Sequence, residues 1–270
     1  MASTLLTGIS AYYPCDDNSS TQPDSVGSND ATLVGNMVYT ASGKINGGVD
    51  GANGSGDYLS IPSAAFNVDE TTDYTISLWL YPTLTTSRNS PFNMSADSNV
   101  YGIACNIDLG TNDTVVWAGQ EAGNTYWSIT TTAHLTQDAW NHLVVIQDVD
   151  DTGKTYIFIN GVLRGVATIS TAGGASGLST SDIEIGRSHA SYYYRGSADE
   201  VGLWTKALTH STTTLGDTAT GEVAELYNSG DGLSYPFSAG SGWTGKINGV
   251  TNPSKVNGQA VANITTINGQ

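Results

Sequence analysis

The amino-acid sequence predicts an all-β sandwich with a short repetitive C-terminal extension, and its composition, turn spacing and final repeats lead to this prediction. The 270 residues include 32 Gly, 14 Tyr and 6 Trp. Aromatic and β-branched residues suit a pleated, half-buried surface, and Gly suits the turns between short strands. Turn residues recur at the spacing of roughly 8–12 residues that is typical of sandwiches. A chain of this length can bury a large core in one β domain.

The clearest predicted strand covers residues 74–81, where alternation places Ile76, Leu78 and Leu80 on one face. A helix is predicted only at 222–228, which a Gly follows closely. The composition predicts an irregular loop at 170–180 and a long loop at 84–99. A Thr-rich connection is predicted at 212–220. The other predicted strands cover 9–14, 57–61, 100–108, 114–118, 125–130, 182–186 and 198–204.

One hairpin is marked by its turn residues. Strands at 140–146 and 154–159 flank the Asp-rich connection 148–153, which ends in Gly. Asn160-Gly161 then predicts a tight turn into 162–165, because Asn and Gly tolerate positive φ. These three strands therefore form a meander.

The character of the chain changes after Phe237. Residues 238–242 have the composition of a flexible linker, and the pattern [KT]-[IV]-N-G follows at 246–249, 255–258 and 266–269, spaced by 9 and then 11 residues. Each copy can form a short strand and a turn, but none can bury its apolar side alone. We therefore expect a module at 1–237 and an anchoring or oligomerisation tail at 238–270, which orders against neighbouring subunits or a partner surface.

The charge balance excludes several classes of partner. Nine Lys and Arg against 25 Asp and Glu give a formal charge of −16, which repels nucleic acids and anionic membranes but suits divalent cations. No stretch is long and apolar enough for a membrane span, and the first residues lack the pattern of a classical signal peptide. An extracellular role therefore requires another route, such as transport on a virus particle, or a signal that this sequence has lost. Cys15 and Cys105 favour buried thiols, although a disulfide stays open.

Some aromatic residues are candidates for glycan binding, because aromatic rings stack on the apolar faces of sugars while neighbouring polar groups bind the hydroxyls. Roughly half of such residues are expected to pack in the core instead. Three consecutive Tyr cannot all face inward on an extended strand. The predicted glycan-binding residues are Trp117, Tyr126, Trp127, Tyr192, Tyr193 and Tyr194, with Gln120, Asn124 and His189 as polar neighbours.

Four stretches, in order, resemble the laminin-G-like jelly rolls of the concanavalin-A-like lectin/glucanase superfamily. The resemblance spans about residues 8–237 and rests on the whole series rather than on one motif. It implies a two-sheet jelly-roll sandwich, with Trp79, Trp140 and Trp204 in core positions. The stretches are 43–51 with 56–62, 73–82, 138–143 through 159–161, and 183–187 with 196–209, closed by 222–228.

The resemblance also implies a structural calcium ion near Asp199, held with acidic residues of the N-terminal loop. The predicted ligands are Asp17, Asp24, Asp30 and Asp199, and the same loop also offers Asp16 and Asn29. The alternatives are that Asp199 caps a turn or pairs with Arg187 or Arg195. A rival acidic cluster at 148–151 is typical of a solvated hairpin loop.

Catalytic signatures are missing from the sequence. The glucanases of the superfamily carry a Glu-x-Asp-x-x-Glu strand that does not occur here, and the adjacent pairs 69–70 and 199–200 should point to opposite faces of a strand. No Gly-x-Ser-x-Gly elbow and no phosphate-binding loop occurs. The sequence therefore predicts a non-catalytic protein.

The tail repeats resemble those near the ends of some bacteriophage structural proteins. This resemblance leads to the hypothesis of a virion surface, decoration or fibre protein whose lectin-like module binds glycans. A purely structural decoration protein is the main alternative, because a fold does not fix a function. A glycoside hydrolase on the same fold ranks last.

Overall fold

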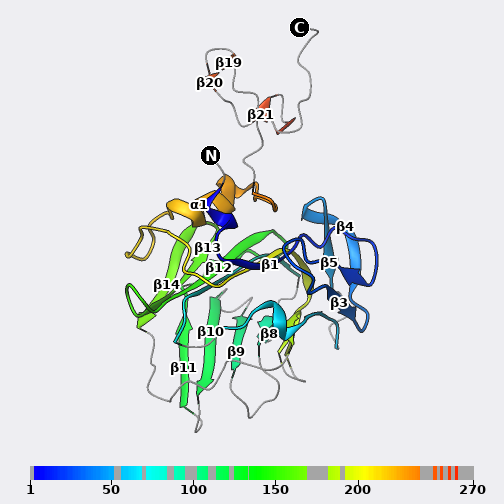
Figure 1. Cartoon of the computed structure of the whole chain (residues 1–270), viewed down its shortest axis with the longest axis horizontal. Coiled ribbons are helices and arrows are strands. Elements are labelled where there is room, and N and C mark those ends of the chain that lie inside the picture. The colour runs from blue at the N-terminus through cyan, green and yellow to red at the C-terminus, as the bar shows by residue number, and fades with distance from the viewer. Residues whose placement is uncertain are drawn as a thin grey trace.

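Two antiparallel β-sheets form most of the structure, which is a computed structural model (Figure 1). It describes residues 3–51, 56–68, 71–83, 88–94, 102–108, 114–121, 125–132, 134–168, 182–188, 192–237, 246–247, 250–251, 255–256 and 259–260. Within these ranges, no helix is long and apolar enough to cross a membrane.

The first sheet, sheet A, contains eight of the described strands. The predicted strand at 74–81 lies near its middle, and the predicted hairpin and Asn-Gly turn form one side of it. The order is β14 (Val162–Thr168), β13 (Lys154–Ile159), β12 (Asn141–Asp148), β7 (Tyr74–Pro82), β18 (Gly196–Trp204), β5 (Gly47–Asp50) and β4 (Val38–Ile45), and β1 (Ile9–Tyr13) also pairs with β18.

The second sheet, sheet B, also contains eight of the described strands. Its order is β11 (Thr125–Thr130), β10 (Thr114–Glu121), β9 (Gly102–Asp108), β8 (Arg88–Asn93), β15 (Ile183–Ile185), β6 (Tyr58–Ile61), β3 (Ala31–Val34) and β2 (Thr21–Gln22). The mini-sheet of β16 (Arg187–Ser188) and β17 (Tyr192–Tyr193) follows β15. Both sheets are antiparallel, which confirms the predicted all-β sandwich.

The main core lies between the two sheets. As the alternation predicts, Ile76, Leu78 and Leu80 of β7 all enter this core. Sheet B contributes alternate residues such as Leu59 and Ile61 from β6. Because each strand has period two, the residues between these positions face away from the core.

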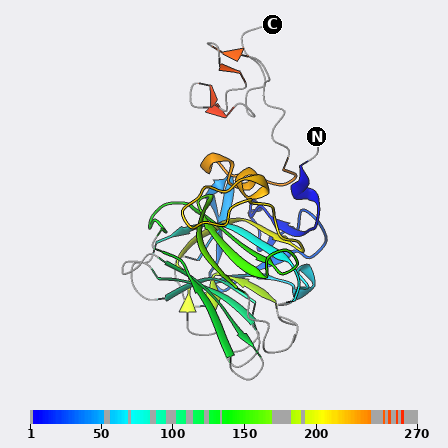
Figure 2. The same ribbon diagram turned by 90° about the vertical axis from the view of Figure 1, so that its left-hand side faces the viewer.

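A second apolar layer covers the outer face of sheet A. There Val144, Phe158 and Trp204 pack against residues from outside the sheet, including Leu226 and Phe237. The cover consists of η1 (Thr4–Leu6), the helix α1 (Gly221–Tyr227) with the short turn η4 (Asn228–Gly230) and the segment 233–237. In both views, α1 and the N-terminal segment lie on the same side of the sheets (Figures 1 and 2). Both ends of the module are thus part of its folded structure.

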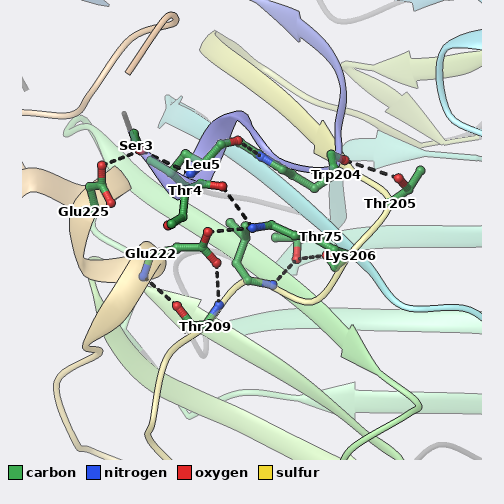
Figure 3. Close-up of polar contacts among 12 residues, drawn as sticks. Ser3, Thr4, Leu5, Thr75, Trp204, Thr205, Lys206, Thr209, Glu222 and Glu225 are labelled. Carbon is green, nitrogen blue, oxygen red and sulfur yellow. Dashed lines mark hydrogen bonds and ion pairs between the residues drawn. The ribbon is translucent and has the colours of Figure 1, made fainter. Parts of the chain in front are cut away.

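Polar contacts tie this cover together (Figure 3). The buried carboxylate of Glu222, in the first turn of α1, accepts from the Lys206 Nζ at 2.6 Å and from the Thr209 amide at 3.0 Å. The Trp204 indole donates to the Leu5 carbonyl at 2.8 Å. A hydroxyl near the N-terminus, that of Ser3, donates to Glu225 at 2.6 Å. The helix is therefore linked both to the chain after β18 and to the N-terminal segment.

Several strands differ from the sequence prediction. The predicted loop at 84–99 contains β8, which lies between β9 and β15 in sheet B, so that prediction was wrong for Arg88–Asn93. Its sequence hides the strand, because Pro91 interrupts it and a register shift separates Asn89 from Phe92. The strands β2, β3, β4 and β5 were not predicted. β2, β3 and β5 are short, and β4 lacks a regular alternation of apolar and polar residues.

The tail contains short hairpins at two of its repeats. β19 (Lys246–Ile247) pairs with β20 (Val250–Thr251), and β21 (Lys255–Val256) pairs with β22 (Gln259–Ala260). The third repeat, at 266–269, lies outside the described residues. In each of these two repeats, the first strand thus pairs with the strand that follows the Asn-Gly.

Candidate functional site

Within the described residues, the second apolar layer covers the outer face of sheet A, so the outer face of sheet B is the candidate sheet surface for a ligand. In β15, Ile183 and Ile185 enter the core, so Glu184 lies on the opposite face. In β6, the same alternation places Tyr58 and Ser60 on that face. Register brings these positions side by side, because Glu184 pairs with Ser60.

Arg187 lies over this face and connects two of its residues. Its Nε donates to the Glu184 Oε2 at 2.8 Å, and its Nη2 donates to the other carboxylate oxygen, so the pair is bidentate. Its guanidinium carbon also lies 3.7 Å from the centre of the Tyr58 ring. The hydrogen bonds to Glu184 raise the pKa of Arg187. We call Tyr58, Glu184 and Arg187 the Arg187 cluster.

Gly186 explains how Arg187 reaches this position. Its φ of +114° suits Gly, and a Cβ there would lie 2.9 Å from the carbonyl oxygen of Asp57. A residue without a side chain therefore lets β16 pass close over β6. Tyr193, which is half-buried, pairs with Arg187 in the β16–β17 mini-sheet.

Further polar groups border the cluster. The Ser60 hydroxyl donates to Asp182 at 3.1 Å, and the Ser63 amide donates to the same carboxylate at 3.2 Å. The Arg187 side chain is 28% exposed and that of Glu184 is 14% exposed, so a ligand can reach both. A guanidinium, two carboxylates and an aromatic ring provide the donors and acceptors that sugar hydroxyls require.

Sequence reasoning did not select the members of the Arg187 cluster as site residues. The stretch 183–187 was noted as a family motif and as part of a predicted strand, and Arg187 only as a possible partner of Asp199. A signal was present, because a charged residue lies between two Ile in a short strand and Gly-Arg follows directly. Nothing local to the sequence, however, indicates that Tyr58 lies beneath Arg187.

Two of the predicted glycan-binding residues are buried, and these predictions were wrong. Trp117 has no exposed surface and packs against Phe92, with ring centres 5.5 Å apart. Tyr194 is 1% exposed, and its hydroxyl donates to the Ser197 carbonyl at 3.1 Å. Both rings belong to the main core, where they have no free face for a sugar.

The other predicted glycan-binding residues lie in strands. Tyr126 pairs with Gln120 and Trp127 with Gly119 along the edge strand β11. Tyr192 lies in β17, where its backbone pairs with β16. The side chains of these three residues, as well as all of Asn124 and His189, lie outside the described residues. Their role in glycan binding stays a prediction. Among the predicted residues whose side chains are described, Tyr193 lies beside the Arg187 cluster.

Asp199 binds a backbone turn. The turn at 43–47 connects β4 and β5, and a side chain on Gly43 would lie 1.4 Å from the Gly47 carbonyl oxygen, so Gly is required. Its tightness aims the Lys44 and Ile45 amides at the Asp199 Oδ2, at 2.8 and 2.9 Å. The Oδ1 of Asp199 accepts from the Glu200 amide at 2.8 Å.

Glu200 does not point away from Asp199 in the way that strand alternation predicts, and the prediction of opposite faces was wrong. A register shift separates Asp199 from Gly202, and Glu200 itself has a φ of +51°. Ala198 and Val201 both reach the core, while Glu200 accepts a hydrogen bond from Tyr12 of the outer layer. The bulge thus buries two consecutive carboxyl groups.

Burial changes the ionisation of this pair. Desolvation and the nearby Glu200 raise the pKa of Asp199 to about 9, although its three amide donors oppose the shift. Desolvation raises the pKa of Glu200 to about 7, against the hydrogen bonds from Tyr12 and Ser234. Asp199 is completely buried and Glu200 is 2% exposed. A polysaccharide cannot reach either group in this conformation.

The predicted calcium ligands do not fit one metal site. Asp24 is buried and accepts from the Tyr12 and Val26 amides at 3.2 and 3.0 Å, while Asp30 accepts from the Asp24 amide at 3.0 Å. The side chain of Asp17 is exposed. Throughout the described ranges, no group of three or more His, Cys, Asp or Glu side chains is placed to hold a metal ion.

Asp16 and the two thiols are held by the fold. Asp16 accepts from the Gly47 amide at 2.7 Å and from the Asn46 side chain at 3.3 Å, on the same turn that Asp199 binds. Cys15 and Cys105 are free, buried thiols, as the favoured interpretation predicts, and burial raises the pKa of both.

Comparisons with solved structures identify the same fold in binding domains. The binding domain of Paraclostridial Mosquitocidal Protein 1 superposes with a TM-score of 0.60 at 15% identity, over 76% of this chain and 50% of that one. The binding domain of botulinum neurotoxin serotype D superposes with a TM-score of 0.57 at 14% identity, over 75% of this chain and 49% of that one. The chain spans about half the length of these toxin domains.

A third solved structure is matched over nearly its whole length. Domain 4 of the extracellular arabinanase AbnA from Geobacillus stearothermophilus, in complex with arabinotriose, gives a TM-score of 0.57 at 20% identity, over 74% of this chain and 94% of that one. At these identities the similarity shows the fold alone. No protein of curated function matches the sequence.

The family is shown by the sequence itself. A model described as the concanavalin A-like lectin/glucanases superfamily matches residues 53–212, which include the Arg187 cluster. This range is more than half of the chain, and the sandwich agrees with it. The chain belongs to the concanavalin A-like lectin/glucanase superfamily.

Proposed function

We propose that this chain is a non-catalytic glycan-binding protein of a virion surface, and that the outer face of sheet B binds the glycan around Arg187. The observation that carries this proposal is the Arg187 cluster itself, in which a guanidinium lies over the Tyr58 ring and binds Glu184 by two hydrogen bonds. Such a pair is held rigidly, so hydroxyl groups can bind it at little cost in side-chain entropy.

The similarity to a complete arabinanase domain supports a sugar ligand. That domain is described in complex with arabinotriose, and this chain covers nearly all of it. One toxin domain with the same fold is described in complex with N-acetylneuraminic acid, but this chain covers only 50% of it. The arabinanase domain is therefore the more informative comparison.

The position of the carboxyl groups supports a protein without hydrolase activity. A glycosidase needs two carboxyl groups that flank an accessible scissile bond. Asp199 and Glu200 are adjacent in space but buried beneath the outer layer of sheet A. In the Arg187 cluster, both carboxylate oxygens of Glu184 already accept hydrogen bonds from Arg187.

The tail supports a role in assembly on a particle, through other virion proteins or through further copies of this chain. In the module, Ile159 pairs with Val162 across Asn160-Gly161, and the tail repeats the same four residue types with the same pairing of Ile247 and Val250. In the module this turn contacts a neighbour, because the Asn160 side chain accepts from the His142 amide at 2.9 Å. An isolated two-stranded hairpin is marginally stable. We expect the tail hairpins to require such a neighbour as well.

Glycan binding is tested by a glycan array followed by titration calorimetry on the full chain. We expect Tyr58→Ala and Arg187→Ala each to weaken binding at least tenfold, because both remove a wall of the site. Lys154→Ala, which removes one positive charge from sheet A, is the matched control and should bind normally. If the unaltered chain binds no glycan above background, the proposed glycan binding is wrong.

A further inference from the structure

The charges around the Arg187 cluster are unbalanced toward negative. Asp182 and Glu184 contribute two carboxylates, and Arg187 contributes one positive charge. The imbalance extends to the whole module. The tail holds two of the nine basic residues and none of the 25 acidic ones, so residues 1–237 carry seven basic and 25 acidic residues, a formal charge of −18. An anionic ligand that approaches this face is therefore repelled at long range.

At short range, the Arg187 guanidinium is already neutralised. Two of its nitrogens donate to the two oxygens of Glu184, the geometry in which a carboxylate ligand would itself bind. One face of the guanidinium plane is also covered, because the centre of the Tyr58 ring lies 3.7 Å from the guanidinium carbon. A carboxylate that bound this edge of Arg187 would have to displace Glu184 and leave a half-buried carboxylate without its partner, which is costly. A carboxylate that bound the remaining N–H groups of Arg187 would lie beside the negative charges of Glu184 and Asp182.

A neutral sugar meets no such cost. Hydroxyl groups both donate and accept, so they can donate to Glu184 and Asp182 while they accept from the edge of Arg187. The ion pair then stays intact. The same groups that repel a carboxylate are therefore good partners for a neutral polyol.

We infer that the Arg187 cluster selects neutral glycans and rejects those that carry carboxylates, with Glu184 as the residue that sets this preference. This inference rests on the proposed glycan-binding function and adds to it the class of ligand. Glu184 acts here as an internal carboxylate that occupies the position of an acidic sugar. Removing its charge should therefore change which ligands bind, and not only how tightly they bind.

The test uses the full chain and pairs of glycans that differ only in a carboxylate. Suitable pairs are oligogalacturonides with their methyl esters, and sialylated oligosaccharides with the methyl esters of their sialic acid carboxylates, together with neutral arabino-oligosaccharides. We expect the neutral member of each bound pair to bind at least tenfold more tightly. Glu184→Gln should improve binding of the acidic member by roughly tenfold, because the Arg187 charge becomes available.

A matched control separates a local effect from the change in net charge. Asp150→Asn removes one negative charge from an exposed position in the β12–β13 hairpin of sheet A and should leave the preference unchanged. Added salt should weaken the long-range repulsion in all variants but not remove the difference between Glu184→Gln and the unaltered chain. Thermal melting of each variant checks that it is folded.

The possible results separate the preference for neutral glycans from glycan binding itself. If neutral and acidic members bind equally well, or if Asp150→Asn shifts the preference as much as Glu184→Gln does, the charge selectivity is wrong while glycan binding stands. If no glycan of either class binds to the unaltered chain or to Glu184→Gln, both the proposed function and this inference are wrong.

Discussion

The Tyr12 hydroxyl donates a hydrogen bond to Glu200 within the apolar layer that covers sheet A. The preceding residue, Asp199, binds the turn between β4 and β5. A bulge in β18 makes both contacts possible, because it turns two consecutive carboxyl groups toward the same layer. This arrangement joins β1, β18 and the segment at 233–237, whose Leu233 carbonyl lies 3.2 Å from the Tyr12 hydroxyl. Four predictions follow from the contacts around this layer and from the tail.

The buried carboxyl pair should make the module less stable as the pH rises. The pKa of Glu200 is about 7 in the folded state, above its ordinary value near 4.5, so the folded state binds the proton more tightly than the unfolded state. The stabilisation that the Glu200 proton contributes is complete below about pH 4. It is lost as the pH rises through 7, by roughly 2 kcal/mol between pH 5 and 8. Asp199, whose pKa rises from 3.8 to about 9, adds to the decline over the same range and continues it toward pH 9. Urea unfolding at several pH values measures it.

Glu200→Gln should remove the part of this decline that Glu200 contributes and raise the melting temperature at pH 8, because the amide carries no charge and can still accept from Tyr12. Asp150→Asn, at an exposed position, controls for net charge and should leave the decline in place. An equal loss of stability in Glu200→Gln between pH 5 and 8 would contradict the assignment to this pair.

Asp199 should matter for stability whether or not calcium is present. Asp199→Asn replaces an oxygen that accepts from a backbone amide with an amino group, which should cost roughly 1–3 kcal/mol. Because the described ligands do not converge, we expect millimolar calcium and a chelator to give the same melting temperature. If calcium raises the melting temperature and Asp199→Asn abolishes that rise, the sequence-based calcium site is right.

Phe237, at the end of the module, should be as important as a central core residue. It is fully buried, and its ring centre lies 5.1 Å from that of Tyr12 and 5.9 Å from that of Trp204. Phe237→Ala should lower the free energy of unfolding by roughly 3–5 kcal/mol. Leu215→Ala, at a site that is 53% exposed, should change it by less than about 0.5 kcal/mol. Similar values for the two variants would mean that 233–237 is not part of the module.

The tail should control assembly without contributing to the fold of the module. We expect the full chain to form oligomers or attach to particles, and a chain ending at Phe237 to be a folded monomer, because both apolar clusters lie within residues 5–237. Light scattering after size exclusion and thermal melting measure the two properties. In the full chain, Ile247→Ser with Val256→Ser should weaken assembly, whereas Lys246→Ser with Lys255→Ser should not. An unchanged particle size after the deletion would contradict the assembly role.

Strong local patterns allowed much of the fold to be predicted. The alternation in 74–81, the Asp-rich hairpin connection and the Asn-Gly turn each correspond to elements of sheet A, because period-two burial and turn chemistry are local properties. Strand β8 was missed for the opposite reason. Its Pro and its bulge break the alternation, and only its neighbours β9 and β15 make it a strand.

The candidate site was less predictable than the fold. Trp117 and Tyr194 were chosen as sugar-binding residues because aromatic side chains serve both in cores and in binding sites, and sequence gives no direct measure of burial. Tyr58 and Arg187 are 129 positions apart in the sequence. The cation–π contact between them depends on the pairing of β6 with β15 and on the close passage at Gly186.

The sequence by itself determined the superfamily, the all-β class, the turns, the absence of glucanase motifs and the segregation of acidic residues from the tail, because these depend on residue types and their local spacing. Only the tertiary structure decided which face of the sandwich stays open, which aromatic rings are buried and where the carboxyl groups of Asp199 and Glu200 point. These properties arise when strands far apart in the sequence pair in register and when one bulge overrides alternation, and local patterns do not encode either event.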